Sequence, residues 1–194
     1  MAWVAFDRAV KDVERFGLDG PADRWRGLRD NLHAEICDRG FNQRRNAFTQ
    51  HYGSDEVDAA VLMMAEVGFL PADDPPVVGT VAAIERDLVR GGFVDRYRTD
   101  SGVDGLPKGE AAFLLCTYWL ADNYALMGRE ADARRVFELI LSIRNDVGLL
   151  AEEYDPVAGR QLGNFPQAFS HLGLINTARN LTQREKPAEV RQKA

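Results

Sequence analysis

The sequence predicts an all-α fold built as an array of helical hairpins, and three observations support this. Apolar residues recur at helical spacing in seven segments of the 194-residue chain. Segments that are apolar on nearly all sides alternate with segments that carry one apolar stripe, and the broadly apolar ones recur roughly every 54 residues. The connections within a pair are short, whereas those between pairs are long. Because a helix that is apolar all round must be buried, we expect three inner/outer pairs and one unpaired inner helix.

Each helix can be assigned in order from its apolar pattern and its flanking Gly and Pro residues. The four inner helices are expected at residues 2–16, 57–65, 111–127 and 165–178. The three outer, amphipathic helices are expected at residues 22–38, 77–90 and 130–144. The polar stretch 183–194 is expected to be a frayed, disordered tail, so that one domain covers residues 1–182.

The composition excludes several classes of function. A net charge of −6 and an isoelectric point near 5.1 argue against a nucleic-acid partner, which requires a basic patch. No uncharged run is long enough to span a membrane, and residues 1–8 do not resemble a signal peptide, so we expect a cytoplasmic protein. The two cysteines and three histidines lack metal-ligand spacing, and there is no phosphate-binding loop. We therefore expect no metal and no cofactor.

The three long connections, at residues 39–56, 91–109 and 145–164, are the expected location of a functional site. In an array of hairpins they all project from one end, and loops longer than roughly a dozen residues are usually functional. They should jointly form one site at the N-terminal ends of the inner helices, where backbone N–H groups converge.

These loops carry a few candidate residues, each with a plain structural alternative. In the first loop, Ser54 and Asp55 are expected to cap the following helix after a short strand. In the second, Arg96 could bind sugar hydroxyls or a carboxylate, or it could be an ordinary surface arginine. Glu110 could be a favourable first-turn charge. The third loop contains the adjacent carboxylates Glu152 and Glu153, a weak signal by itself because such residues are usually solvated.

Four segments of the chain resemble glycoside hydrolase family 15, the glucoamylase and trehalase family, and most of all its bacterial members. They are FVDRY at 93–97, GEAAFLLC at 109–116, GLLAEEYD at 148–155 and LGNFPQAFSH at 162–171. The resemblance runs from Met1 to about Leu181. It implies an (α/α)6 barrel, of which this chain would form the C-terminal part with about seven of the twelve helices.

The resemblance also implies an inverting mechanism, which uses a general base and a general acid on opposite sides of the scissile bond. The family's base matches Glu152, and Glu153 is its neighbour. Arg96 matches a family arginine that hydrogen-bonds the sugar, and Tyr97 follows it as in the family. Phe113 falls where some members place a tryptophan near the substrate, and Glu110 is a further candidate for substrate binding.

Two features depart from the family pattern. Fungal members have a hydroxyl residue that supports the base near Gly163, and glycine cannot do this. The family's general acid lies in a Trp-Glu motif, but none of Trp3, Trp25 and Trp119 is followed by glutamate. We therefore expect a chain that supplies the base for an α-glucoside substrate, an oligosaccharide or trehalose. The isolated chain should be inactive, associate with itself, or need a second chain that carries the N-terminal half.

Two other interpretations remain open. The chain could be a non-catalytic αα-repeat scaffold that binds protein or carbohydrate on its long-loop face. A metal-dependent enzyme with six hairpins is disfavoured by the absence of His or Cys ligand spacing.

Overall fold

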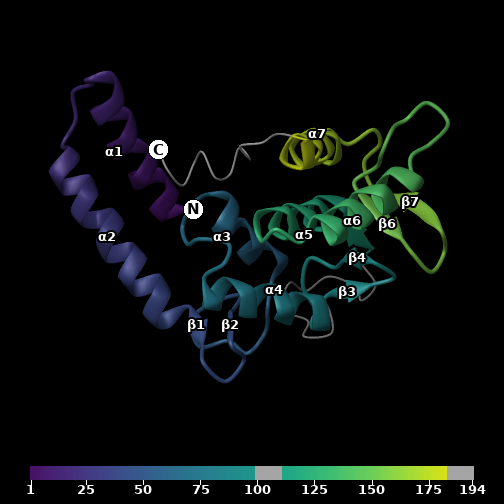
Figure 1. Cartoon of the computed structure of the whole chain (residues 1–194), viewed down its shortest axis with the longest axis horizontal. Helices are drawn as coiled ribbons and strands as arrows, with labels where there is room; N and C mark the ends of the chain where they lie inside the picture. The colour runs from purple at the N-terminus through teal and green to yellow at the C-terminus, as the bar shows by residue number, and fades with distance from the viewer. Residues whose placement is uncertain (99–110, 183–194) are drawn as a thin grey trace.

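The computed structural model describes residues 1–98 and 111–182. Over these ranges the chain contains seven α-helices, joined by loops that pair as very short strands (Figure 1). The all-α prediction is therefore confirmed. The helices are α1 (Ala2–Phe16), α2 (Ala22–Arg39), α3 (Met63–Glu66), α4 (Pro75–Asp87), α5 (Leu114–Leu126), α6 (Glu130–Ser142) and α7 (Ala168–Thr182).

The second inner helix differs most from its prediction. Instead of one regular helix over 57–65, the chain forms a 3-10 turn, η1 (Ala59–Leu62), followed by the one-turn helix α3. Its cap is also not the one expected, because the Asp58 side chain accepts the Ala60 N–H at 2.7 Å. Ser54 instead accepts the Glu56 N–H through its hydroxyl, and Asp55 pairs with Arg44.

The strands lie in the long connections. They are β1 (Phe41–Asn42), β2 (Ala47–Phe48), β3 (Val89–Arg90), β4 (Phe93–Val94), β5 (Ala112–Phe113), β6 (Glu153–Asp155) and β7 (Arg160–Leu162). Strand β1 pairs with β2 and β3 with β4, while β5, β6 and β7 form one antiparallel sheet in that order. In this sheet Glu153 lies opposite both Phe113 and Leu162.

Backbone hydrogen bonds join the three long loops to one another, as the array predicts. Asp58 forms an isolated bridge with Tyr97, and the Ala59 N–H donates to the Arg96 carbonyl at 2.8 Å. These contacts link the residues directly after the first loop to the second loop. The β5–β6 pairing links the residues directly before α5 to the third loop. The three loops therefore meet where η1, α5 and α7 begin.

Helix α5 is the centre of the core. Ten of its thirteen residues are buried, so it is enclosed on all sides, as predicted from a sequence that is apolar nearly all round and carries one charge, Asp122. Its neighbours are α6 and α7 (Figure 1). It runs in the same direction as α7, because Tyr118 packs against Gly173 and, further along both helices, Asp122 accepts a hydrogen bond of 2.9 Å from Asn180.

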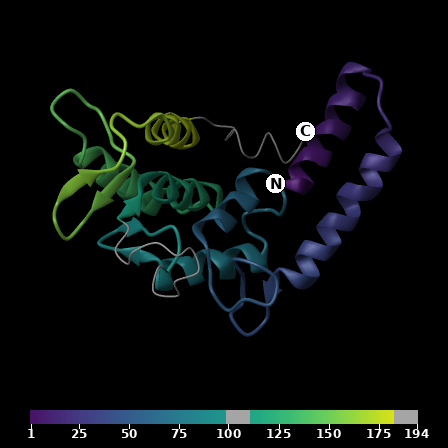
Figure 2. The same cartoon turned by 180° about the vertical axis from the view of Figure 1, so that it is seen from behind.

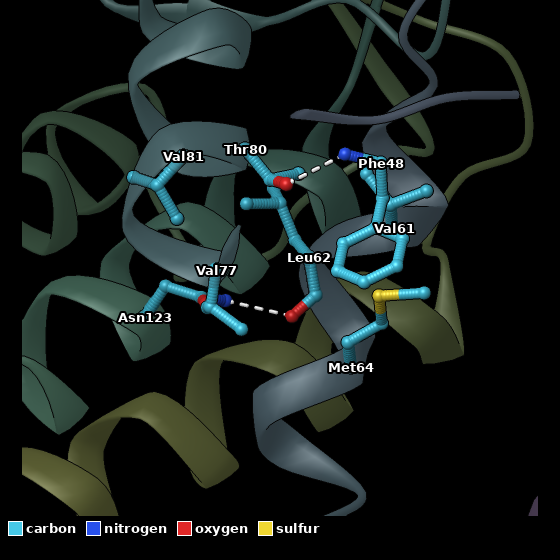
Figure 3. A pocket seen from close by; sticks show the side chains of 8 residues that line it. All are labelled: Phe48, Val61, Leu62, Met64, Val77, Thr80, Val81 and Asn123. Carbon is cyan, nitrogen blue, oxygen red and sulfur yellow. Dashed lines mark hydrogen bonds between the residues drawn. The ribbon is translucent and has the colours of Figure 1, made fainter. Parts of the chain in front are cut away.

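A second packed region joins α4, η1 and α5 to the first loop (Figure 3). The Thr80 hydroxyl on α4 accepts the Phe48 N–H at 2.9 Å, and the Asn123 amide on α5 donates to the Leu62 carbonyl at 2.9 Å. The surrounding side chains are apolar and leave no room for a water molecule. These two side-chain bonds therefore satisfy backbone groups that water cannot reach.

The α1–α2 hairpin lies at one end of the molecule (Figures 1 and 2). Trp3 and His33 pack on Phe69, with ring centroids 5.1 and 4.5 Å away, and the Arg8 guanidinium donates to the Val67 carbonyl. The expectation that α1 is broadly buried is wrong: only Trp3, Asp7 and Val10 are buried. An apolar cavity of about 240 Å³ lies between this hairpin and the η1–α3 segment.

Helix α7 has an unusual distribution of side chains. The face toward α5 carries the buried residues Ser170, Gly173, Thr177 and Asn180. The large apolar residues Phe169, Leu172 and Ile175 lie on another face and are 56%, 54% and 51% exposed. Within residues 1–98 and 111–182, none of the helices has the length and hydropathy needed to span a bilayer.

Candidate active site

Glu152 lies where the third loop enters β6, directly after the buried residues Leu150 and Ala151. Its own side chain is partly buried. The Glu152 N–H donates to the Asn164 carbonyl, and the Glu152 carbonyl accepts the Leu114 N–H, both at 3.0 Å. The backbone of the candidate base is thus held on one side by the turn after β7 and on the other by the start of α5.

The carboxylate itself is held by a backbone donor. The Asn164 N–H donates to Glu152 Oε2 at 3.1 Å. Gly163 packs against the same side chain: a Cβ at this position would lie 2.9 Å from Oε2 and 3.0 Å from the Glu152 Cβ. Gly163 also has a φ of +76°, which an L side chain rarely adopts. The backbone next to Gly163 therefore supplies the polar contact that its missing side chain cannot.

Glu152 and Glu153 make different contacts although they are adjacent in sequence. Glu153 pairs within the sheet with Phe113 and Leu162. Glu152 lies at a bend directly before β6, and its N–H donates to the Asn164 carbonyl, one residue beyond the position that the register of β6 and β7 would place opposite it. The regular pairing is thus interrupted at Gly163.

Arg96 and Tyr97 lie in the second loop, and Phe113 is the last residue of β5, directly before α5. The Arg96 side chain is exposed, and its guanidinium carbon lies 5.5 Å from the centroid of the Tyr97 ring. Both residues are fixed through their backbones to the first loop. Phe113 is partly buried against the core and pairs with Glu153 across β5 and β6, which brings it next to the Glu152 segment. Glu110 lies outside the described residues.

Three other ionisable groups near these loops have shifted pKa values, and each shift has a structural cause. Burial raises the pKa of Asp95, and the Arg90 guanidinium at 2.8 Å acts in the opposite direction. The N–H groups of Ala158 and Val157 lower the pKa of Asp155 at the β6–β7 turn. Burial raises the pKa of the Cys116 thiol well above its usual range, so it is a poor nucleophile.

His171, on α7, binds the backbone two residues before Glu152: its Nε2 accepts the Leu150 N–H at 3.3 Å. Among residues 1–98 and 111–182, no group of three or more His, Cys, Asp or Glu side chains could hold a metal ion.

The sequence predicts Glu152 as the base but does not predict the residues that contact it. The Asn164 donor is a backbone group, and no side-chain pattern marks it. Gly163 is the one readable signal, since a glycine beside a candidate base can mark a close approach or a positive φ.

The chain is similar to known proteins in sequence and in fold. The family model described as "Glycosyl hydrolases family 15" matches residues 1–179. The chain is 41% identical over 184 residues to a trehalase of Thermoplasma volcanium, covering 94% of this chain and 29% of that protein. It is 42% identical over 189 residues to a trehalase of Mycobacterium tuberculosis, covering 97% of this chain and 28% of that protein. The chain thus spans less than a third of the length of these relatives.

Solved structures share the fold. A bacterial glucoamylase complexed with acarbose superposes with a TM-score of 0.81 at 13% identity, covering 98% of this chain and 34% of that chain. A glycosidase superposes with a TM-score of 0.71 at 22% identity, covering 84% of this chain and 46% of that chain. Because the family model covers residues 1–179, the chain belongs to glycoside hydrolase family 15.

Proposed function

We propose that this chain supplies the general base, Glu152, of an inverting hydrolase that acts on α-glucosidic bonds. The observation that carries the proposal is the restraint on this side chain: Glu152 is partly buried, and the Asn164 N–H binds its Oε2. Its position at the junction of the long loops and the similarity to trehalases support the assignment. The substrate class is an α-glucoside, either trehalose or an oligosaccharide.

In an inverting mechanism the base removes a proton from a water molecule as that water attacks the anomeric carbon. The Asn164 N–H fixes one carboxylate oxygen, so the other, Oε1, takes the proton. A carboxylate held by a backbone group does not need to reorient during the reaction, which is the advantage of a preorganised site.

We propose that Arg96, Tyr97, Glu110 and Phe113 bind the sugar. The exposed Arg96 guanidinium has five N–H donors that suit hydroxyl oxygens. Phe113, paired with the strand that follows Glu152, offers an apolar surface for a sugar ring. These roles come from the family resemblance, and the pairing of Phe113 with Glu153, the neighbour of the base, supports the role of Phe113.

The general acid belongs to the part of the family's catalytic domain that lies outside these 194 residues. It is carried either by the same polypeptide or by a second one, since none of the three tryptophans here is followed by glutamate. The exposed apolar face of α7 formed by Phe169, Leu172 and Ile175 supports such a partner, because exposed apolar patches mark interaction sites. Self-association through this face is the other outcome.

The test uses the complete catalytic domain, with this chain joined to or mixed with the remainder of the family domain. Glucose release from trehalose and from maltose is measured for the wild type, Glu152→Gln and Glu153→Gln. We expect Glu152→Gln to lower kcat about 10²–10⁴-fold with the fold unchanged. Glu153→Gln is the matched control and should retain most activity. Near-normal turnover of Glu152→Gln would exclude Glu152 as the base.

A non-catalytic scaffold is the alternative, and the lack of a Trp-Glu pair in the sequence favours it. A scaffold should be a monomer that unfolds cooperatively and gains no activity from the rest of the domain. Analytical ultracentrifugation with and without that remainder separates the two. Complementation with recovery of hydrolysis supports the catalytic proposal.

A further inference from the structure

The backbone on the N-terminal side of Glu152 is held by an unusual set of partners. All six N–H and C=O groups of residues 150–152 are hydrogen-bonded, although Leu150 and Ala151 lie outside any helix or strand. Five of the six partners lie in the stretch 161–171, and the sixth is at the start of α5: His171 and Gln167 for Leu150, Gln161 and Ser170 for Ala151, and Asn164 and Leu114 for Glu152.

Two of these partners bind the peptide groups of Ala151, the residue directly before the candidate base. Ser170, in the first turn of α7, is fully buried, and its hydroxyl donates to the Ala151 carbonyl at 2.7 Å. The Gln161 side-chain oxygen accepts the Ala151 N–H. Because Ala151 is itself only 2% exposed, water cannot replace these bonds.

Gln161 also connects this segment to the outer helix. Its side-chain nitrogen donates to the Ile143 carbonyl at 2.9 Å, at the end of α6, and to the Leu149 carbonyl at 3.4 Å. One amide group thus spans from α6 to the segment that carries the base. The two peptide groups that flank the Ala151 Cα are therefore both fixed, the one before it by β7 and the one after it by α7.

We propose that Ser170 and Gln161 are positioning residues for Glu152. This inference rests on the proposed role of Glu152 as the base. Neither side chain acts on the reacting atoms: both act through the peptide groups of Ala151, which set the direction in which the Glu152 side chain leaves the backbone. A shift of about 1 Å in a reacting group can lower a rate about 10²-fold, so this restraint affects the chemical step rather than substrate binding.

The test compares Ser170→Ala with a matched control on the same helix. Thr177 is also fully buried on α7, and among the residues that the structure describes its hydroxyl has no hydrogen-bond partner. Thr177→Val therefore removes a buried hydroxyl without affecting Ala151. In the complete catalytic domain, we expect Ser170→Ala to lower kcat for trehalose or maltose about 10- to 100-fold with KM changed less than about threefold. Thr177→Val should leave both near the wild type, and Ser170→Thr should restore most of the lost kcat.

A second variant keeps the inference testable if Ser170→Ala does not fold. Gln161→Met preserves length but removes both hydrogen-bonding groups, and we expect the same selective loss of kcat. A rise in KM with unchanged kcat for folded Ser170→Ala or Gln161→Met would overturn the inference, as would kcat values equal to that of Thr177→Val.

A measurement on this chain alone separates failure of the positioning inference from failure of the proposed function. Amide hydrogen exchange at Ala151 and Glu152 should be at least about tenfold faster in Ser170→Ala than in Thr177→Val, because the local restraint is lost. Equal exchange in the two variants overturns the inference. If exchange accelerates but Glu152→Gln retains full activity in the complete domain, the proposed base is wrong and the restraint still stands.

Discussion

Replacing Gly163 by alanine tests the contact between the β7 turn and the candidate base. The new Cβ would lie 2.9 Å from Glu152 Oε2 and 3.0 Å from the Glu152 Cβ, both shorter than ordinary van der Waals contacts. Either the carboxylate or the turn must move, and the Asn164 N–H bond to Oε2 is lengthened or lost in both cases. The variant should therefore be less stable and should have a displaced base.

The loss of unfolding free energy expected for Gly163→Ala has two contributions that can be measured separately. An L residue at the Gly163 φ of +76° costs about 1–2 kcal/mol for the left-handed backbone. Overpacking against Glu152 adds about 1–3 kcal/mol. Gly128 is the matched control, because it has a φ of +77° and an added Cβ there would meet nothing within 4 Å. Gly128→Ala should thus show the backbone contribution alone.

The assay is urea unfolding of both variants and the wild type at one protein concentration, followed by far-UV circular dichroism. We expect Gly163→Ala to lose about 1–3 kcal/mol more unfolding free energy than Gly128→Ala. In a Glu152→Ala background this excess should shrink, because the contact with Oε2 is gone. Equal losses for the two glycine variants in the wild-type background would refute the reasoning.

Three further outcomes follow from contacts described above. Gly173→Ala should lower the unfolding free energy by about 1–3 kcal/mol in the same urea assay, because its Cβ would approach the Tyr118 ring to 2.6 Å. Gly27→Ala is the control: an added Cβ meets open space on α2, so this variant should be neutral or stabilising. Thr80→Val should lower the unfolding free energy by about 1–3 kcal/mol, because it leaves the buried Phe48 N–H without an acceptor (Figure 3). A loss below about 0.5 kcal/mol in urea unfolding would contradict this. The pKa of Asp155 is lower in the folded chain than its ordinary value of 3.8, so ionised Asp155 stabilises the folded state. This stabilisation is present above pH 3.8 and is lost as the pH falls through the folded-state pKa. Thermal unfolding should therefore show a smaller fall in Tm between about pH 5 and about pH 3 for Asp155→Asn than for the wild type, and an identical fall would count against this account.

The parts of the fold that the sequence predicted best are those in which local pattern and burial coincide. Helix α5 has apolar residues all round and is enclosed all round, and the bounds of α1 agree with the sequence. The segment 57–65 was predicted poorly because it is too short for a helical period to be distinct. Ser54 and Asp55 were predicted to cap this segment, but Asp58 caps it. Asp55 instead pairs with Arg44 and Asn42, which lie more than ten residues earlier in the chain.

Only part of the candidate site could be predicted from the sequence, because its contacts join residues that are distant along the chain. Adjacent glutamates and a family resemblance marked Glu152, but its restraint depends on a backbone N–H and on side chains that bond to a backbone. Ser170 and Gln161 have no distinguishing spacing, since a serine in a first turn and a glutamine in a loop are common. The sugar-binding roles of Arg96, Tyr97, Glu110 and Phe113 remain predictions.

The pairing of β5 with β6 has a mechanical consequence. Leu114 is the first residue of α5, and its N–H is bonded to the Glu152 carbonyl, so the loop bearing the carboxylate is attached to the most enclosed helix of the molecule. Any sliding of α5 along its axis would carry the aromatic ring at 113 and the acid at 152 together, with their spacing preserved. The connection 145–164 is therefore held to the core as firmly as α5 itself.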